Sequence, residues 1–237
     1  MNQLTLGEIT VDVIQKDIKN VHLSVYPPTG RVRIAAPLRM DVDTIRIYAI
    51  SKLGWIKKQQ TKFREQVRET PREFLNKEGH YFLGKRYLMK VVERETPPSV
   101  NIKHNVIELY VRPGSPQVKR NEILDDWYRG ELKSLLPPMI KTWERKLKVS
   151  LSEFGIKKMK TKWGACNTEA KRIWLNLELA KKPIHCIEYI VAHEMIHLLE
   201  RLHNGNFVAL MDHHMPEWKI YRQELNRLPV RHAEWKY

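Results

Sequence analysis

The feature that most constrains this chain is the segment His-Glu-Met-Ile-His at residues 193–197. Pro183 suits the first turn of a helix, and Ile187, Ile190 and Val191 supply an apolar face, so the segment is predicted to be helical. Residues four apart on a helix project from the same face, one turn from each other. Two imidazoles in that arrangement can share one Zn²⁺ at roughly 2.0–2.1 Å each.

Glu194 stands directly after the first of these histidines. In that place a carboxylate can take the proton from a water that the metal activates, without binding the metal itself. The alternative interpretation is a pair of solvent-facing helix histidines. The helical context and the adjacent acid favour a metal site, with His193 and His197 as ligands and Glu194 as the catalytic base.

A catalytic zinc needs a third protein ligand and an open fourth position. His203 follows His193 by ten residues, which on an unbroken helix would place it roughly 15 Å along the axis and about 80° around it. The helix must therefore end between Leu198 and Leu202, and Asn204-Gly205 marks the turn. His203 is favoured as the third ligand, and the rival donors on the expected next helix are His213, His214, Glu217 and Glu224.

The remaining histidines and the cysteines carry less information. Cys166 is expected to be a packed thiol rather than a nucleophile or ligand. Two cysteines make no disulfide framework, the N-terminus resembles no secretory signal, and no apolar run is long enough for a membrane span. A reduced, cytoplasmic setting without membrane contact is therefore expected. No spacing that suggests ligation is found for His22, His80, His104, His185 and His232.

The formal net charge of +15 favours anionic partners, or serves solubility alone. Lys158, Lys160 and Lys162 would share one face if their segment is a strand, which would suit phosphate or nucleic acid, and a solvated strand edge is the alternative. Residues 172–179 alternate in polarity, and this expected strand is a candidate for binding a substrate by backbone pairing.

The chain is predicted to be α+β, with a β-rich region at residues 1–117 and a mostly helical region at 118–237 that holds a small antiparallel sheet and the active helix. One long helix is expected from Asp41 or Asp43 to about Thr70-Pro71. Further expectations are a hairpin at 81–87, a strand at 106–111 and helices from about 119 to Leu147 that Pro137-Pro138 interrupt. No internal repeat is evident.

Several segments together match the pattern of one known family. They are Arg31-Val32-Arg33 with Pro37, Trp55-Ile56, residues 81–87, residues 160–166, Leu175-Asn176, residues 193–197, His203 and residues 214–218. The chain thereby resembles the YgjP-like family of metal-dependent hydrolases, which is related to the SprT and WLM zincins. The resemblance spans nearly the whole chain, and the Lys-Trp-Gly-Ala-Cys segment combined with the three histidines is its most specific part.

The resemblance implies a zincin-like C-terminal half with His193, His197 and His203 as ligands and Glu194 as base. Glu200 stands where the longer metzincin pattern has glycine, which argues against that class. The family usually has serine at the position of Ala165. Family members carry a metallopeptidase label, and some relatives are described as nucleoside triphosphate pyrophosphohydrolases.

Three functions remain open from sequence. The first is a zinc metallopeptidase with one Zn²⁺ per chain, the second a zinc-dependent nucleotide hydrolase, and the third a nucleic-acid-binding protein whose zinc is not catalytic. The expected substrate is accordingly a peptide or protein, or a nucleotide. The protein is also expected to associate weakly with nucleic acid through its basic surface. The expected substrate-binding residues are Lys158, Lys160, Lys162, Trp163 and Asn176.

Overall fold

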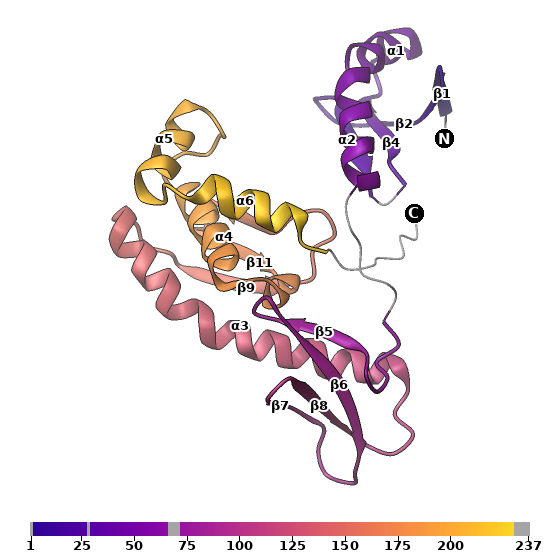
Figure 1. The fold of residues 1–237 in the computed structure, drawn as a ribbon. Helices are drawn as coiled ribbons and strands as arrows, with labels where there is room; N and C mark the ends of the chain where they lie inside the picture. The colour runs from indigo at the N-terminus through magenta and orange to yellow at the C-terminus, as the bar shows by residue number, and fades with distance from the viewer. Residues whose placement is uncertain (1, 28, 66–71, 230–237) are drawn as a thin grey trace. The chain divides into compact units, whose positions relative to one another are not determined.

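The computed structural model describes residues 2–27, 29–65 and 72–229 (Figure 1). These residues form three small mixed sheets and six α-helices, which agrees with the expected α+β class. The chain divides into two compact units, Met1–Val67 and Arg68–Tyr237, and each has its own hydrophobic core. None of the described helices combines the length and hydropathy needed to cross a bilayer.

The first unit is a four-stranded sheet followed by two helices. Its central strands are parallel and both outer pairs are antiparallel. Val32, Ile34 and Ala36 alternate along one strand and are buried, as the period-two pattern predicts. In sheet order the strands are β1 (Asn2–Leu6), β2 (Ile9–Lys16), β4 (Arg31–Pro37) and β3 (His22–Tyr26), and the helices are α1 (Val42–Ser51) and α2 (Leu53–Glu65).

The helical stretch of the first unit is broken, where one long helix was expected. Asp41 caps α1 as predicted, because its side chain accepts a hydrogen bond from the Thr44 backbone N–H at 2.7 Å. The Lys52 N–H bonds back to the Ala49 carbonyl at 3.1 Å, which ends α1, and α2 begins at the next residue. The expected end at Thr70-Pro71 lies outside the described residues.

The second unit begins with another four-stranded sheet, which has the same topology as the first. Its two central strands are parallel and its two outer pairs antiparallel, so one strand arrangement occurs twice although no sequence repeat is evident. In sheet order the strands are β5 (Gly79–Phe82), β6 (Lys85–Glu93), β8 (Val106–Val111) and β7 (Ser99–Lys103). The expected strand at 106–111 is confirmed.

The β5–β6 hairpin is also confirmed, and its tip is hydrogen-bonded to a later segment of the second unit. Leu83 and Gly84 both have positive φ, 47° and 82°, as the two central residues of a type I′ turn require. Their backbone N–H groups donate to the carbonyls of Ala180, at 2.9 Å, and Lys181, at 3.2 Å. The tip thereby holds Ala180 and Lys181, which lead into the helix predicted to carry His193.

This second sheet shares one core with the long helix α3 (Gln117–Leu147). Met89, Ile107 and Leu109 of the sheet are buried in the same hydrophobic cluster as Leu132 and Trp143 of the helix. The compact units therefore divide before β5, and not near residue 117, where a short Pro-Gly segment had suggested a linker.

Helix α3 runs without interruption through Pro137 and Pro138, which corrects the expected break. Both prolines lie on the exposed face, where water can bond to the carbonyls that lose their partners. The opposite face is a buried stripe at helical spacing that holds the helix together across this point. Its members are Leu124, Tyr128, Leu132, Leu136, Ile140, Trp143 and Leu147.

The third sheet is mixed and not antiparallel as expected, because β9 (Glu153–Lys157) pairs in parallel with β11 (Arg172–Asn176). β10 (Gly164–Asn167) pairs with the other side of β11. The strand expected at 172–179 stops at Asn176, whose side chain accepts from the Glu178 N–H and starts a 3₁₀ turn. The remaining elements are η1 (Leu177–Lys181), α4 (Ile184–Ile196), α5 (Gly205–His214) and α6 (Trp218–Arg227).

Because the two units have separate hydrophobic cores, we predict that they unfold in two separate thermal transitions. Ile34→Ala should remove side-chain packing from the first unit alone and cost about 2–5 kcal/mol of its free energy of unfolding. Differential scanning calorimetry should therefore show two transitions, of which this variant lowers one. The matched control is Ile107→Ala, the same change in the second core, which should lower the other transition. A single transition shifted equally by both variants would contradict separate cores.

Candidate metal centre

Helix α4 carries His193, has His197 as its C-cap residue, and lies inside the core of the second unit. Nine of its 13 residues are buried, including the expected face of Ile187, Ile190 and Val191. It packs against α3, α5, α6, β10 and β11 (Figure 1). A helix held from so many directions gives its side chains fixed positions.

Helix α4 ends at Ile196, shortly before the interval predicted from geometry. The following N–H groups, up to Glu200, bond back to the last carbonyls of the helix. The Glu200 carboxylate then accepts a hydrogen bond from the Leu202 N–H at 3.0 Å, and Asn204 caps α5. These local bonds turn the chain back on itself, so that His203 returns to the end of α4.

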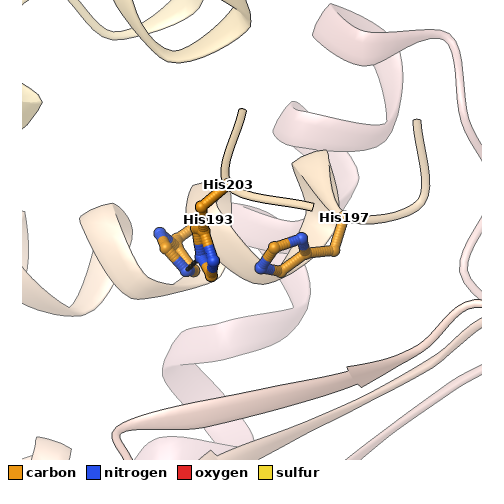
Figure 2. Close-up of side chains that lie close together, drawn as sticks. All are labelled: His193, His197 and His203. Atoms are coloured by element: carbon orange, nitrogen blue, oxygen red, sulfur yellow. Dashed lines mark hydrogen bonds between the residues drawn. The ribbon is translucent and has the colours of Figure 1, made fainter. Parts of the chain in front are cut away.

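Three imidazoles meet at this turn (Figure 2). The Nε2 atoms of His193 and His203 are 2.9 Å apart, and one ring nitrogen from each of His193, His197 and His203 lies within 4.8 Å of the others. The ring centroids are 4.6–5.0 Å apart. Three nitrogen donors this close together are able to supply the protein ligands of an open tetrahedral metal site.

The surroundings of the histidines fit a divalent cation such as zinc. His197 Nδ1 lies 3.0 Å from the Glu200 carbonyl oxygen, a contact that orients the ring and leaves Nε2 for a metal. Burial, with the nearby charges of His197, His203 and Arg222, lowers the pKa of His193 to about 3. Burial and the charges of His197 and Arg222 also lower the pKa of His203. Neutral imidazole is the form that binds metal.

Glu194 lies on α4 against the first residue of β10. Its side chain is only 6% exposed, and this burial raises the pKa of the carboxyl to about 7, while the charge of Lys162 opposes the shift. A Cβ at Gly164 would lie 2.6 Å from both Cγ and Oε1 of Glu194. Only glycine leaves room for the carboxylate, a role for Gly164 that the sequence analysis missed because nothing local indicates the contact.

Aromatic side chains enclose the histidines on the protein side. The Phe207 ring, on α5, lies 4.7–4.9 Å from all three imidazole centroids and is buried. Tyr189 meets His193 edge-on at 5.9 Å and stacks on Trp218 at 6.3 Å. Sequence reasoning also missed these residues, although Phe207 follows the Asn204 cap by only three positions. They exclude water from one side of the site.

The rival third ligands are engaged elsewhere. Glu217 accepts a hydrogen bond from the Tyr221 hydroxyl, and Glu224 pairs with His185 at 2.6 Å. His213 and His214 contact each other at the end of α5. Within the described part of the chain, His203 is the donor that joins His193 and His197 in a cluster.

The three lysines do not share a strand face, because residues 158–163 form a loop between β9 and β10. This corrects the strand interpretation. Lys158 pairs with the Asp125 carboxylate on α3. Lys160 and Lys162 are exposed, and the charge of Lys162 acts on Glu194. Of the three, Lys162 is therefore the one whose charge reaches the candidate site.

Trp163 and Asn176 shape this loop. The Asn176 amide donates to the carbonyls of Met159, at 2.9 Å, and Lys162, at 2.8 Å, while its oxygen faces the N–H groups of Met159 and Glu178. Its hydrogen-bonding capacity is thus used within the chain, which makes it a loop-shaping residue. Trp163 is half-buried, with the Lys182 ammonium 5.4 Å from its ring centroid.

Strand β11 lies in the middle of its sheet, between β10 and β9. Both of its edges are occupied, so it cannot pair with a substrate as expected from its alternation. β10 is an edge strand of this sheet, and its first residue touches Glu194. The strand available for backbone pairing beside the site is therefore β10.

Comparison with known proteins shows the family of the chain. The model of the YgjP-like metallopeptidase domain matches residues 19–228, and the chain belongs to the YgjP-like family. The metallopeptidase zymogen jannalysin of Methanocaldococcus jannaschii is similar at 20% identity and a TM-score of 0.34, over 37% of this chain and 90% of that chain. No curated protein matches. Family membership supports a metal-dependent hydrolase.

Loss of the third imidazole should release the metal. His203→Ala should lose most of the Zn²⁺ that the wild-type protein retains after dialysis, because two nitrogen ligands hold zinc poorly. Inductively coupled plasma mass spectrometry measures the zinc content of each protein. His213→Ala, the same change outside the cluster, is the control and should retain the metal. Full retention in His203→Ala would move the third ligand to another residue.

Gly164→Ala should displace the carboxylate without removing the metal. The added methyl group would collide with Glu194, so turnover should fall by about tenfold or more, the effect expected of a misplaced catalytic group. Zinc content and hydrolysis rate should be measured together on a substrate that the wild type cleaves. Gly130→Ala is the control, because its new Cβ meets open space. Unchanged turnover in Gly164→Ala would contradict the steric argument.

Proposed function

We propose that this protein is a zinc metallopeptidase that binds one catalytic Zn²⁺ through His193, His197 and His203, with Glu194 as its general base. The observation that carries the proposal is the convergence of three imidazole nitrogens beside a buried carboxylate. Three neutral ligands leave a coordination position for substrate or water, as hydrolytic zinc sites do.

The bound zinc would polarise the scissile carbonyl and lower the pKa of water. Glu194 accepts the proton of the attacking water on its carboxylate and returns it to the amine nitrogen of the leaving group. Gly164 lets the carboxylate approach, since any Cβ there would occupy its place. The contact of His197 Nδ1 with the Glu200 carbonyl keeps the ring in its ligand orientation.

Strand β10 supports a peptide as the substrate. An extended peptide can add to the edge of a sheet by main-chain hydrogen bonds, and β10 is an edge that begins at the catalytic carboxylate. A peptide bound in this way runs past Glu194, so that a carbonyl group of its backbone reaches the metal centre.

The two alternative functions have less support. A nucleotide hydrolase would need cations arranged around the phosphates, whereas the lysines lie in a loop and Lys158 is paired with Asp125. A nucleic-acid-binding protein with a non-catalytic zinc would normally enclose the ion with four protein ligands. Around His193 the described residues bring three donors together, with Glu194 beside them.

A hydrolysis screen tests the proposal and separates the substrate classes. Zinc-loaded wild type and Glu194→Gln should be compared on unstructured peptides and on nucleoside triphosphates. Removal of the general base should lower the rate of peptide cleavage about 10²–10⁴-fold while the zinc content stays the same. Cleavage sites are identified by mass spectrometry, and pyrophosphate release is followed in parallel.

Glu169→Gln is the matched control, because it makes the same chemical change at an exposed residue in the β10–β11 turn and should cleave peptides at the wild-type rate. Peptide cleavage that persists in Glu194→Gln would overturn the assignment of the base. Pyrophosphate release that Glu194→Gln abolishes, with no peptide cleavage, would overturn the peptidase proposal in favour of a nucleotide hydrolase.

A further inference from the structure

A second cluster of metal-binding side chains lies at the other end of α4. His185 and Cys186 are on the first turn of this helix, and Glu224 is on α6, which packs beside it. One nitrogen, one sulfur and one carboxylate oxygen from these residues all lie within 4.8 Å of one another. Nothing in the sequence pattern groups these residues, since Glu224 is 39 residues from His185.

The three donors differ in their access to solvent. The side chains of His185 and Glu224 are 41% and 40% exposed, whereas Cys186 is fully buried beneath them. The Cys186 Sγ lies 3.8 Å from the Tyr221 carbonyl oxygen, which is a weak contact for a thiol. A cation can therefore approach from solvent through the exposed pair and reach a sulfur that has no strong partner.

The donor set selects a class of cation. A thiolate, an imidazole and a carboxylate together suit borderline-soft ions such as Zn²⁺, and not Mg²⁺ or Ca²⁺. Tetrahedral zinc with its usual bond lengths places its ligand atoms about 3.3–3.6 Å apart. His185 Nε2 and Glu224 Oε2 are now 2.6 Å apart and all three donor atoms lie within 4.8 Å of one another, so ligation requires these separations to change by about 1 Å.

We propose that His185, Cys186 and Glu224 form a second zinc site, which joins α6 to α4 and is completed by water. On binding, the Cys186 thiol releases its proton to solvent and the sulfur bonds to the ion. The proton that His185 Nε2 shares with Glu224 moves through solvent to Nδ1 of the same ring, and the hydrogen bond is replaced by one bond from each residue to the ion. The inference does not depend on the proposed peptidase function, because none of these residues belongs to the first cluster.

The second site would also brace the first. His185 precedes His193 by eight residues on α4, about 12 Å along the helix axis. Helix α6 begins with Trp218, which stacks on Tyr189, and Tyr189 in turn contacts the His193 ring. An ion that fixes α6 against α4 thus fixes the aromatic side of the catalytic cluster.

Cobalt(II) is the probe that distinguishes the two sites, because sulfur coordination gives a thiolate-to-cobalt charge-transfer band in the near ultraviolet. The reduced, metal-free full-length protein is titrated anaerobically with Co²⁺. The wild type should bind two ions per chain and show the band. Cys186→Ser should bind one ion and lose the band, and Glu224→Gln should weaken binding of the sulfur-coordinated ion at least about tenfold.

The chain offers two matched controls. Cys166→Ser changes the other free cysteine and should keep both ions and the band. His193→Ala removes a ligand of the first cluster and should keep the band while losing the other ion. Circular dichroism verifies that each variant folds, and if Cys186→Ser does not, Glu224→Gln decides the question. No band in the wild type, a band that Cys166→Ser abolishes, or unchanged affinity in Glu224→Gln would overturn the proposal.

Discussion

The burial of helix α4 is the constraint on which the rest of the second unit depends. The apolar face of this helix packs on α3, its N-terminal approach is held by the tip of the β5–β6 hairpin, and its C-terminal end supports the histidines. Because other helices and strands pack around α4, this packing positions the imidazoles, and no long-range ion pair is needed to hold them. The packing of the core therefore fixes the position of helix α4, and helix α4 in turn fixes the positions of the site residues.

The cluster of three histidines could be predicted from sequence because its determinants are local. Helical periodicity places His193 and His197 on one face, and the rise per residue shows that His203 can join them only if the helix ends. The chain does turn at that point, and the three rings meet. The side-chain contacts that hold the turn, through Glu200 and Asn204, also lie within a few residues.

The features that sequence reasoning missed depend on contacts between distant segments. Gly164 is required by Glu194, thirty residues later, and the central position of β11 follows from its pairing with β9. Helix α3 continues through Pro137 and Pro138 because its opposite face is buried by the rest of the unit. The unit boundary was misplaced for the same reason, since a Pro-Gly turn does not reveal that the sheet before it shares a core with the helix after it.

The spacing of the donors gives the two proposed sites different places in the order of folding. His193 and His203 are ten residues apart, whereas His185 and Glu224 are separated by 39. Closing the longer loop costs about 1.2 kcal/mol more in chain entropy, and it also requires α6 to dock. A metal ion can therefore assist α4 and its turn while they form, whereas an ion at the second site can bind only after the two helices have met.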